Sequence, residues 1–469
     1  MSSISHVYCD LSAARCASAA PTAEHPQLVL TTTILASSLA FVDGSVVNVA
    51  LPAIGDALSA DSGALQWCIN AYLLPLSAML LLGGAIGDSF GRRRVLVIGI
   101  ALFGIASLAC ALSPTLPVLL AARFLQGAGA AALMPNSLAI LGQTFSGTAK
   151  GRAVGIWAAT SAIAGAVGPV LGGWLIDLGS WRAIFLINLP LAIVAILLAV
   201  RYVPRERECS DEPLDLRGGA LVTAGLGALT WALTVATGPS GWTAGAGVSG
   251  FAGGALLVWF VRVERQQSNR ALMPLHLFAA KSFIGLSALT LLLYGAFSAL
   301  LVLVPYVLIE AKGYSGTAAA AALLPLPIIL TLSSPLTGAL AGRTGARLPI
   351  TVGSLMVGVG LLLTLRVQPG TSYWSGLLPA ILVTSAGLSA AVAPLTTAVL
   401  DSADARYTGA ASGLNSAIAR TGSLIATALL GTVLASRGDQ LLASFHTAMA
   451  LSALACFGAA LFAFALLKR

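Results

Sequence analysis

Charged residues are scarce in this chain. Only 9% of its 469 residues are Asp, Glu, Lys or Arg, whereas soluble domains carry about 25%. Hydrophobic residues make up 57%, and the mean hydropathy is +0.92. These values exclude an ordinary soluble protein and predict a chain that lives in a membrane.

Residues that usually carry chemistry are also few. The four histidines and six cysteines are scattered, without the close pairs typical of a metal site or a redox motif. The Gly-x-x-x-x-Gly-Lys-Ser/Thr loop that holds ATP phosphates does not occur. We therefore predict no metal, no cofactor and no enzyme activity, with an ion gradient as the energy source.

Long apolar runs fill most of the remaining sequence. A helix needs about 20 apolar residues to cross a bilayer, and the strands of a membrane barrel need about half as many. The runs have helical length, which predicts an all-α membrane protein with about 14 spans. They cover residues 28–51, 67–87, 95–112, 116–141, 153–176, 183–203, 220–237, 246–263, 283–309, 318–341, 349–365, 377–400, 409–435 and 443–467.

The positive charges alternate along the chain. Most of the 25 Lys and Arg residues fall in every second gap between spans, which predicts that those gaps and both termini are cytoplasmic. The net charge of +8 is thus explained by the orientation of the protein in the membrane, with anionic lipid as the partner of the positive residues. Nucleic acid is not an expected partner. The small, polar residues before Pro26 lack the features of a cleaved signal, so we expect a disordered cytoplasmic tail.

Two long polar gaps divide the chain. They follow the sixth and eighth spans and predict a tail over 1–26, a six-helix half over 27–203, a linker with a two-helix insert over 204–265, and a second six-helix half over 266–469. Gly-rich turns ending in Arg follow the second span of each half, at 84–92 and 338–347. Such repeated halves are typical of secondary transporters, which bind substrate between them.

Five segments make the chain resemble the major facilitator superfamily, and within it the fourteen-helix drug:proton antiporter branch. FVDGSVVNVALP at 41–52 resembles the signature of that branch, and the loop containing Asp88 resembles the gate motif of the superfamily. RFLQGAGAAALMP at 123–135 resembles its proton-relay motif, and SWRAIFLINLP at 180–190 also fits. A fifth-span motif associated with exporters is matched by Gly165, Gly168, Pro169, Gly172 and Gly173. The chain departs from these patterns at Gly44, Ser89 and Gly342, which leaves Asp88 to supply the carboxylate of the gate.

Asp43 and Arg123 are the candidate proton-coupling residues. Each is charged and lies within an apolar run, where a charge costs about 2.5–3.5 kcal/mol. Burial favours the protonated form of a carboxyl, as a proton carrier requires. Arg123 is the expected counter-charge and, by resemblance, couples protonation to substrate release. The residues alone also allow a protonated Asp43 that joins two helices and an Arg123 that bonds to backbone carbonyls.

The remaining candidates fall in three groups. Gly84, Asp88, Gly91 and Arg92 form the expected intracellular gate, with Asp88 holding the start of the thirteenth span near Gly409. The fifth-span glycines should present a flat strip to a partner helix, either for tight packing or for rocking. Possible substrate or coupling residues are Asn48, Gln126, Glu310 and Arg420.

The resemblance implies a proton-coupled exporter of hydrophobic or amphipathic small molecules. We expect it to work as a monomer in a bacterial inner membrane by alternating access. One alternative is a dedicated exporter of a single metabolite made by the cell, which would share every motif. A channel or a receptor is a further alternative, but it would need a selectivity filter or a sensory domain for which we find no pattern.

Overall fold

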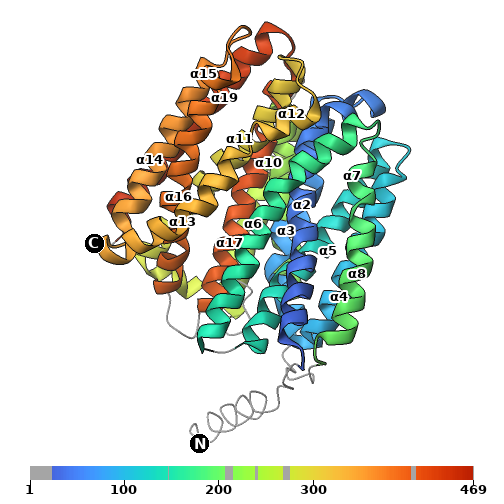
Figure 1. The fold of residues 1–469 in the computed structure, drawn as a ribbon, viewed down its shortest axis with the longest axis vertical. Helices are drawn as coiled ribbons and strands as arrows, with labels where there is room; N and C mark the ends of the chain where they lie inside the picture. Colours follow the sequence, from blue (N-terminus) through green and yellow to red (C-terminus); the bar gives the residue numbers. More distant parts are fainter. Residues whose placement is uncertain are drawn as a thin grey trace, which may run out of the picture.

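The computed structural model describes residues 24–145, 147–205, 215–237, 241–267, 275–402 and 408–467. This part of the chain is helical and contains no strand (Figure 1). Its first half contains α2 (Pro26–Leu58), α3 (Ser62–Phe90), α4 (Arg92–Ala111), α5 (Leu116–Thr144), α6 (Gly147–Asp177), α7 (Ala183–Leu186) and α8 (Asn188–Tyr202). Two helices follow, α9 (Leu216–Thr237) and α10 (Ala244–Gln267). The remaining elements are η2 (Leu275–Ala279), α11 (Lys281–Glu310), α12 (Gly316–Ala321), α13 (Pro325–Thr344), α14 (Arg347–Leu363), η3 (Thr364–Arg366), α15 (Tyr373–Gly376), α16 (Leu378–Asp401), α17 (Thr408–Ala428), α18 (Gly431–Ala435) and α19 (Asp439–Leu466).

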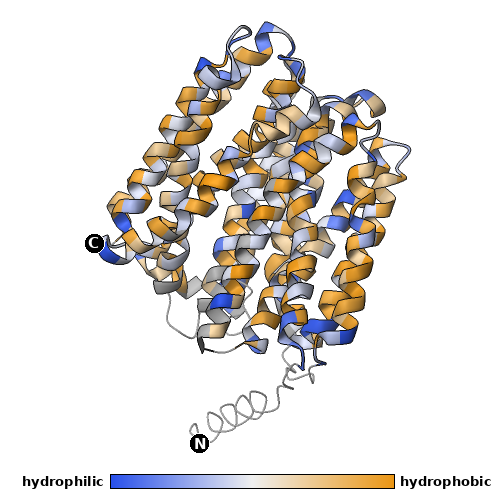
Figure 2. Cartoon of the chain, in the orientation of Figure 1, coloured by the Kyte–Doolittle hydropathy of each residue, from blue (hydrophilic) through white to orange (hydrophobic). Residues whose placement is uncertain are grey.

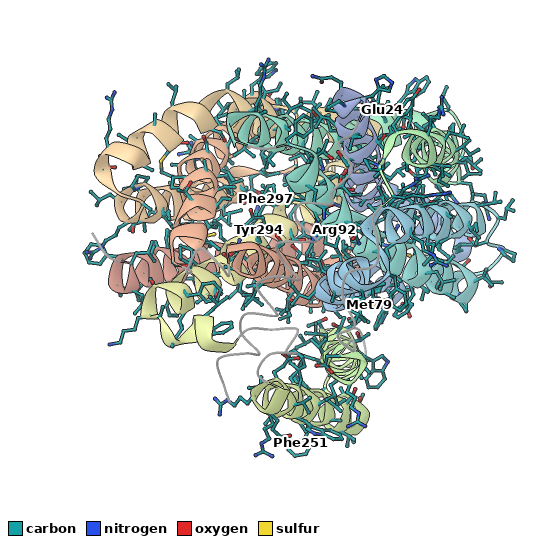
Figure 3. The ribbon with its side chains drawn as sticks, turned by 90° about the horizontal axis from the view of Figure 1, so that it is seen from below. Glu24, Met79, Arg92, Phe251, Tyr294 and Phe297 are labelled. Carbon is teal, nitrogen blue, oxygen red and sulfur yellow. The ribbon has the colours of Figure 1, made fainter. Side chains whose placement is uncertain are left out.

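The helices form two bundles that stand side by side. One contains α2 to α8 and the other contains α11 to α19, with α6 and α17 near the middle (Figure 1). The helices α9 and α10 pack against each other, and α9 also packs on α3. The view along the bundle shows the pair at its edge (Figure 3). Apolar residues occupy the length of the helices, and hydrophilic residues gather at their ends (Figure 2).

Thirteen helices in the described residues are long and apolar enough to cross a membrane. The predicted fifth span corresponds to α6, whose shorter apolar stretch is Ile163–Asp177. The expectation of about 14 spans is therefore met approximately. Three predicted spans are broken into consecutive α-helices, namely α7 and α8, α12 and α13, and α17 and α18, and the short helix α15 precedes the predicted span that α16 forms. One break has a clear cause, because Pro325 lacks an N–H group and therefore suits the start of α13.

Contacts between the halves are well defined at one end of the bundle. We call the end where α2 begins the lower end and the end where α3 begins the upper end, as in Figure 1. At the upper end, Gln66 Nε2 in α3 donates to the carbonyls of Thr427 and Ala428 in α17, at 3.3 and 3.2 Å. Farther down α6 and α13, a Cβ added at Gly155 or Gly338 would meet no atom within 4 Å. The halves are thus hydrogen-bonded to each other at the upper end, and in the lower part Gly413 of α17 approaches Leu81 of α3 while Gly155 and Gly338 have no neighbour against them.

Candidate functional site

A buried ion pair joins two helices of the first half. Asp43 in α2 is 0% exposed, and Arg123 in α5 is 1% exposed. The guanidinium of Arg123 pairs with Oδ2 of Asp43. The other carboxylate oxygen, Oδ1, accepts hydrogen bonds from Gln126 Nε2 at 2.7 Å and from Asn188 Nδ2 at 3.2 Å. Both oxygens of the carboxylate are therefore engaged by protein donors.

The planar fork of Arg123 is held from several sides. Its Nη1 also donates to Gln126 Oε1 at 2.7 Å, and its Nε donates to the carbonyl of Cys68 at 3.1 Å. The guanidinium carbon lies 4.4 Å from the centre of the Tyr72 ring, a distance typical of a cation–π contact. Arg123 thus has the carboxylate partner expected from the sequence and also a backbone carbonyl partner.

Ser107 closes the polar network around the ion pair. Its hydroxyl accepts from Gln126 Nε2 at 2.8 Å and from Asn188 Nδ2 at 3.3 Å. Sequence reasoning did not single out Ser107, Asn188 or Tyr72, although each is a polar residue in an apolar run. The site is a compact, dry network built around one titratable carboxylate. Adding a proton to that carboxylate would remove the charge that holds Arg123.

The other candidate residues lie apart from this network. Asn48 is buried, and its Oδ1 finds no hydrogen-bond partner among the described residues. Glu310 is exposed at the upper end, in a small polar pocket of about 280 Å³ that it shares with Asp56, Tyr306 and Arg437. The guanidinium of Arg420 in α17 lies 5.5 Å from the centre of the Phe41 ring in α2. Only Gln126 among the possible substrate residues joins the Asp43 network.

The expected lower gate is described in part. Gly91 has a φ of +89° and forms the turn between α3 and α4, a conformation that glycine adopts readily. A Cβ at Gly84 would touch Pro135, and Arg92 donates to the carbonyl of Ala139 at 3.3 Å. The Asp88 side chain and residues 403–407 lie outside the described residues, so the expected contact between Asp88 and the start of α17 stays a prediction. Within the described parts of the chain, no cluster of three or more His, Cys, Asp or Glu residues could hold a metal ion.

The sequence predicted that the fifth-span glycines form one strip against one partner helix. In the structure they do not. Gly168 and Gly172 face α2, where an added Cβ would collide with Ser45 and Val46 respectively. Gly173 instead abuts Gly316 at the start of α12, in the other half. A Cβ at Gly165 would meet nothing within 4 Å, so this glycine lies at no helix interface. The expected single strip is wrong because α6 crosses from α2 to α12 along its length.

Two substitutions should separate these environments. Gly172→Leu would push α6 away from α2 next to Asp43, and overpacking of this kind costs about 1–3 kcal/mol. We expect Gly172→Leu to lower the melting temperature of the purified protein by several degrees and to impair transport. Gly165→Leu is the matched control and should melt close to the wild type. Equal melting of the two variants would contradict this account of the packing.

Asp177 makes a second contact between the halves, at the upper end of α6. Its Oδ1 accepts from the backbone N–H of Gly316 at 3.1 Å. Its Oδ2 accepts from the backbone N–H of Thr317 at 3.1 Å and from the Thr317 hydroxyl at 2.6 Å. A carboxylate of the first half thus caps the start of α12 in the second half. Because Gly173 abuts Gly316, the two backbones can approach closely enough for these bonds to form.

Comparison with characterised proteins places this geometry in a family. Residues 33–427 match the Major Facilitator Superfamily. The chain is 36% identical over 417 residues to the multidrug resistance protein Stp of Mycobacterium tuberculosis, covering 87% of this chain and 76% of Stp. It is 32% identical to a probable actinorhodin transporter of Streptomyces coelicolor (84% of this chain, 69% of that protein). It is 30% identical to the tetracenomycin C resistance and export protein of Streptomyces glaucescens (85% and 74%).

Solved structures share the fold at low sequence identity. The structure superposes on a crystal structure of the peptide transporter POT in complex with sulfate with a TM-score of 0.70 at 13% identity, covering 96% of this chain and 97% of that one. It superposes on a D-xylose–proton symporter with a TM-score of 0.68 at 15% identity, covering 94% and 98%. From the family match, the similar export proteins and the shared helical fold, we conclude that this chain belongs to the Major Facilitator Superfamily of membrane transporters.

Proposed function

We propose that the protein exports hydrophobic or amphipathic small molecules across a bacterial inner membrane in exchange for protons. The observation that carries the proposal is the buried Asp43–Arg123 pair, because a carboxylate at this depth in a membrane bundle is costly and is typically found in proton relays. The relatives named for multidrug resistance and for antibiotic export support the direction of transport.

The polar network suggests how a proton would be used. A proton on Asp43 neutralises the carboxylate, and the guanidinium of Arg123 then loses its counter-ion while keeping the Cys68 carbonyl and Gln126 as partners. Arg123 cannot give up its own proton, so its uncompensated charge must be stabilised by a shift of α5 relative to α2. Coupling follows when this local shift favours one arrangement of the two halves over the other.

The contacts between the halves suggest which arrangement this structure represents. Hydrogen bonds of Asp177 and Gln66 hold the two halves together at the upper end, and no neighbour packs on Gly155 or Gly338 farther down. With both termini on the cytoplasmic side, as the positive charges predict, the lower end is cytoplasmic. We therefore assign this structure to the inward-facing state of an alternating-access cycle.

Loss of the Asp177 carboxylate should weaken the closed upper end. Asp177 is exposed, so we take the value of a helix cap, about 1 kcal/mol, for Asp177→Asn, or about a fivefold shift toward the outward-open state. Distances between spin labels at Leu178 and Gln368, exposed residues of the two halves, would report this shift. Asp61→Asn is the matched control, because Asp61 caps only its own helix, α3. The same distance distribution in both variants would contradict the role of Asp177.

Transport by purified protein in liposomes tests the proposed function. An imposed pH gradient should drive accumulation of a lipophilic cation such as ethidium, and dissipating the gradient with a protonophore should stop it. Each elementary charge moved across 100 mV contributes about 2.3 kcal/mol, so one or two protons suffice for strong accumulation. Equal movement of ethidium with and without a gradient would contradict proton coupling and favour a channel.

A dedicated exporter of one metabolite is the second candidate. The similarity to the tetracenomycin C export protein and to the probable actinorhodin transporter favours it. Growth inhibition by a panel of unrelated toxic compounds, with and without the gene, would decide between the two candidates. Protection against many compounds supports a multidrug exporter, and protection against a single compound supports a dedicated one.

A further inference from the structure

Arg420 is a cation without an acidic partner at the junction of the two halves. It lies in α17 of the second half, and two of its side-chain contacts are with the first half. Its guanidinium carbon is 5.5 Å from the Phe41 ring centre, and Nη2 lies 3.8 Å from the Met134 sulfur. Within the described residues, Arg420 forms no ion pair, and the thioether of Met134 is a weak acceptor.

Among the described residues, no nearby carboxylate is free to balance this charge. Both oxygens of Asp43 are used by Arg123, Gln126 and Asn188. Phe41, which lies against the Arg420 guanidinium, is two residues before Asp43 in α2, so Arg420 lies beside the Asp43 network but is not part of it. A guanidinium in a membrane bundle is costly without an anion or a dense set of acceptors. Within the described residues, the positive charge of Arg420 is therefore not balanced by an anion.

The side chains around Arg420 are aromatic rings and a polarisable thioether. The Phe41 ring and the Met134 thioether touch the guanidinium, and Tyr294 in α11 interacts with its charge. Tyr294 and Phe297 lie near the middle of the bundle in the view from the lower end (Figure 3). Flat rings and polarisable sulfur pack well against a planar ligand, and the fork of Arg420 matches a carboxylate in two-point geometry.

The position of Arg420 suits a ligand that arrives from the lower end. Its neighbour Met134 lies in α5 about 16 Å below Arg123, at 1.5 Å per residue. Its other neighbour, Phe41, lies two residues before Asp43 in α2, so the Arg420 side chain spans the space between Met134 and the level of the Asp43 network. A negative group held at Arg420 would therefore lie close to the Asp43 network without touching its ion pair.

We propose that Arg420 binds the anionic group of the substrate, and that this transporter accepts planar aromatic compounds bearing a carboxylate or a phenolate. This proposal rests on the export function proposed above. The anionic group pairs with the guanidinium, and the aromatic part lies among Phe41, Met134 and Tyr294. Arg420 then contributes selectivity for charge, while Asp43 and Arg123 contribute coupling to protons.

Binding of 2-naphthoate and 2-naphthamide to the purified protein tests the proposal. The two compounds have nearly the same shape and differ by one negative charge. The wild type should bind 2-naphthoate more tightly than 2-naphthamide. In Arg420→Gln, the affinity for 2-naphthoate should fall about tenfold or more, as expected for a lost charge-assisted contact, whereas 2-naphthamide should bind nearly as before. Arg420→Lys should keep part of the preference and provides a second variant if Arg420→Gln does not fold.

Arg437→Gln is the matched control. Arg437 is a second-half arginine at the upper end, where it donates to the Tyr306 hydroxyl and to the Leu434 carbonyl, and its loss should not change the preference. A wild type without preference for 2-naphthoate, or an equal loss of both ligands in Arg420→Gln, would overturn the proposal. Gradient-driven accumulation of either ethidium or 2-naphthoate by the wild type judges the export function separately, because the binding assay needs no gradient.

Discussion

The Asp43→Asn protein should still bind substrate but should no longer use a pH gradient to move it. Asparagine keeps the shape of the side chain and can accept from Gln126 and Asn188, but it carries no charge for Arg123 and no titratable proton. Removing one partner of a buried ion pair costs about 3–5 kcal/mol. The hydrogen bonds of Arg123 to Cys68 and Gln126 should offset part of this cost, so we expect a folded but less stable protein.

Two assays in liposomes separate the functions of Asp43. Accumulation driven by an imposed pH gradient should fall to the level of empty liposomes, whereas exchange of labelled for unlabelled substrate without a gradient should persist. Asp43→Glu is the control, because it keeps a carboxyl near Arg123 and should retain part of the driven transport. Driven accumulation by Asp43→Asn at the wild-type rate would show that another residue carries the proton.

Arg123→Lys should nearly abolish transport although the positive charge is kept. The guanidinium bonds at the same time to Asp43, to Gln126 and to the Cys68 carbonyl, and its flat face lies over Tyr72. A lysine ammonium is a compact charge without a planar fork, and it cannot reproduce this set of contacts. Each hydrogen bond to a charged group contributes about 1.5–3 kcal/mol, so losing two should slow transport about a hundredfold or more.

The comparison of Arg123→Lys with Gln126→Ala shows whether the whole fork matters. Gln126→Ala removes one partner of Arg123 and one partner of Asp43 but leaves the ion pair in place. It should therefore lower driven transport less than Arg123→Lys does. Initial rates of ethidium accumulation at equal protein amounts provide the measurement. If Arg123→Lys transported at the wild-type rate, Arg123 would serve only to pack helices and would have no role in coupling.

The spans and the ion pair could be predicted because their cause is local. A run of about 20 apolar residues must cross the bilayer as a helix, whatever its neighbours are, and the match between predicted spans and helices follows from this. Asp43 and Arg123 stood out for the same reason, since each is a charge inside such a run. Two opposite charges in one apolar medium have a strong tendency to meet, and in the structure they do.

The errors and omissions concern contacts between distant segments. Spacing placed Gly165 in register with Gly173, but only the path of α6 across α2 and α12 decides which glycine meets a partner. Asn188 was overlooked because a lone amide in an apolar run gives no hint of the carboxylate it will reach. Asp177 carried no signal at all, since an acidic residue near the end of a span is usually a solvated one.

The amino-acid sequence alone determined that this protein is a helical membrane bundle with one acidic and one basic residue buried in its first half. Hydropathy and isolated charge are properties of short segments, so both can be recognised without knowledge of the fold. Only the tertiary structure decided that Asn188 and Ser107 complete the ion-pair network and that Asp177 caps a helix of the other half. The same holds for Arg420, which has no acidic partner among the residues that the structure describes. These facts depend on how helices far apart in the chain are rotated and crossed, and that is set by packing between them.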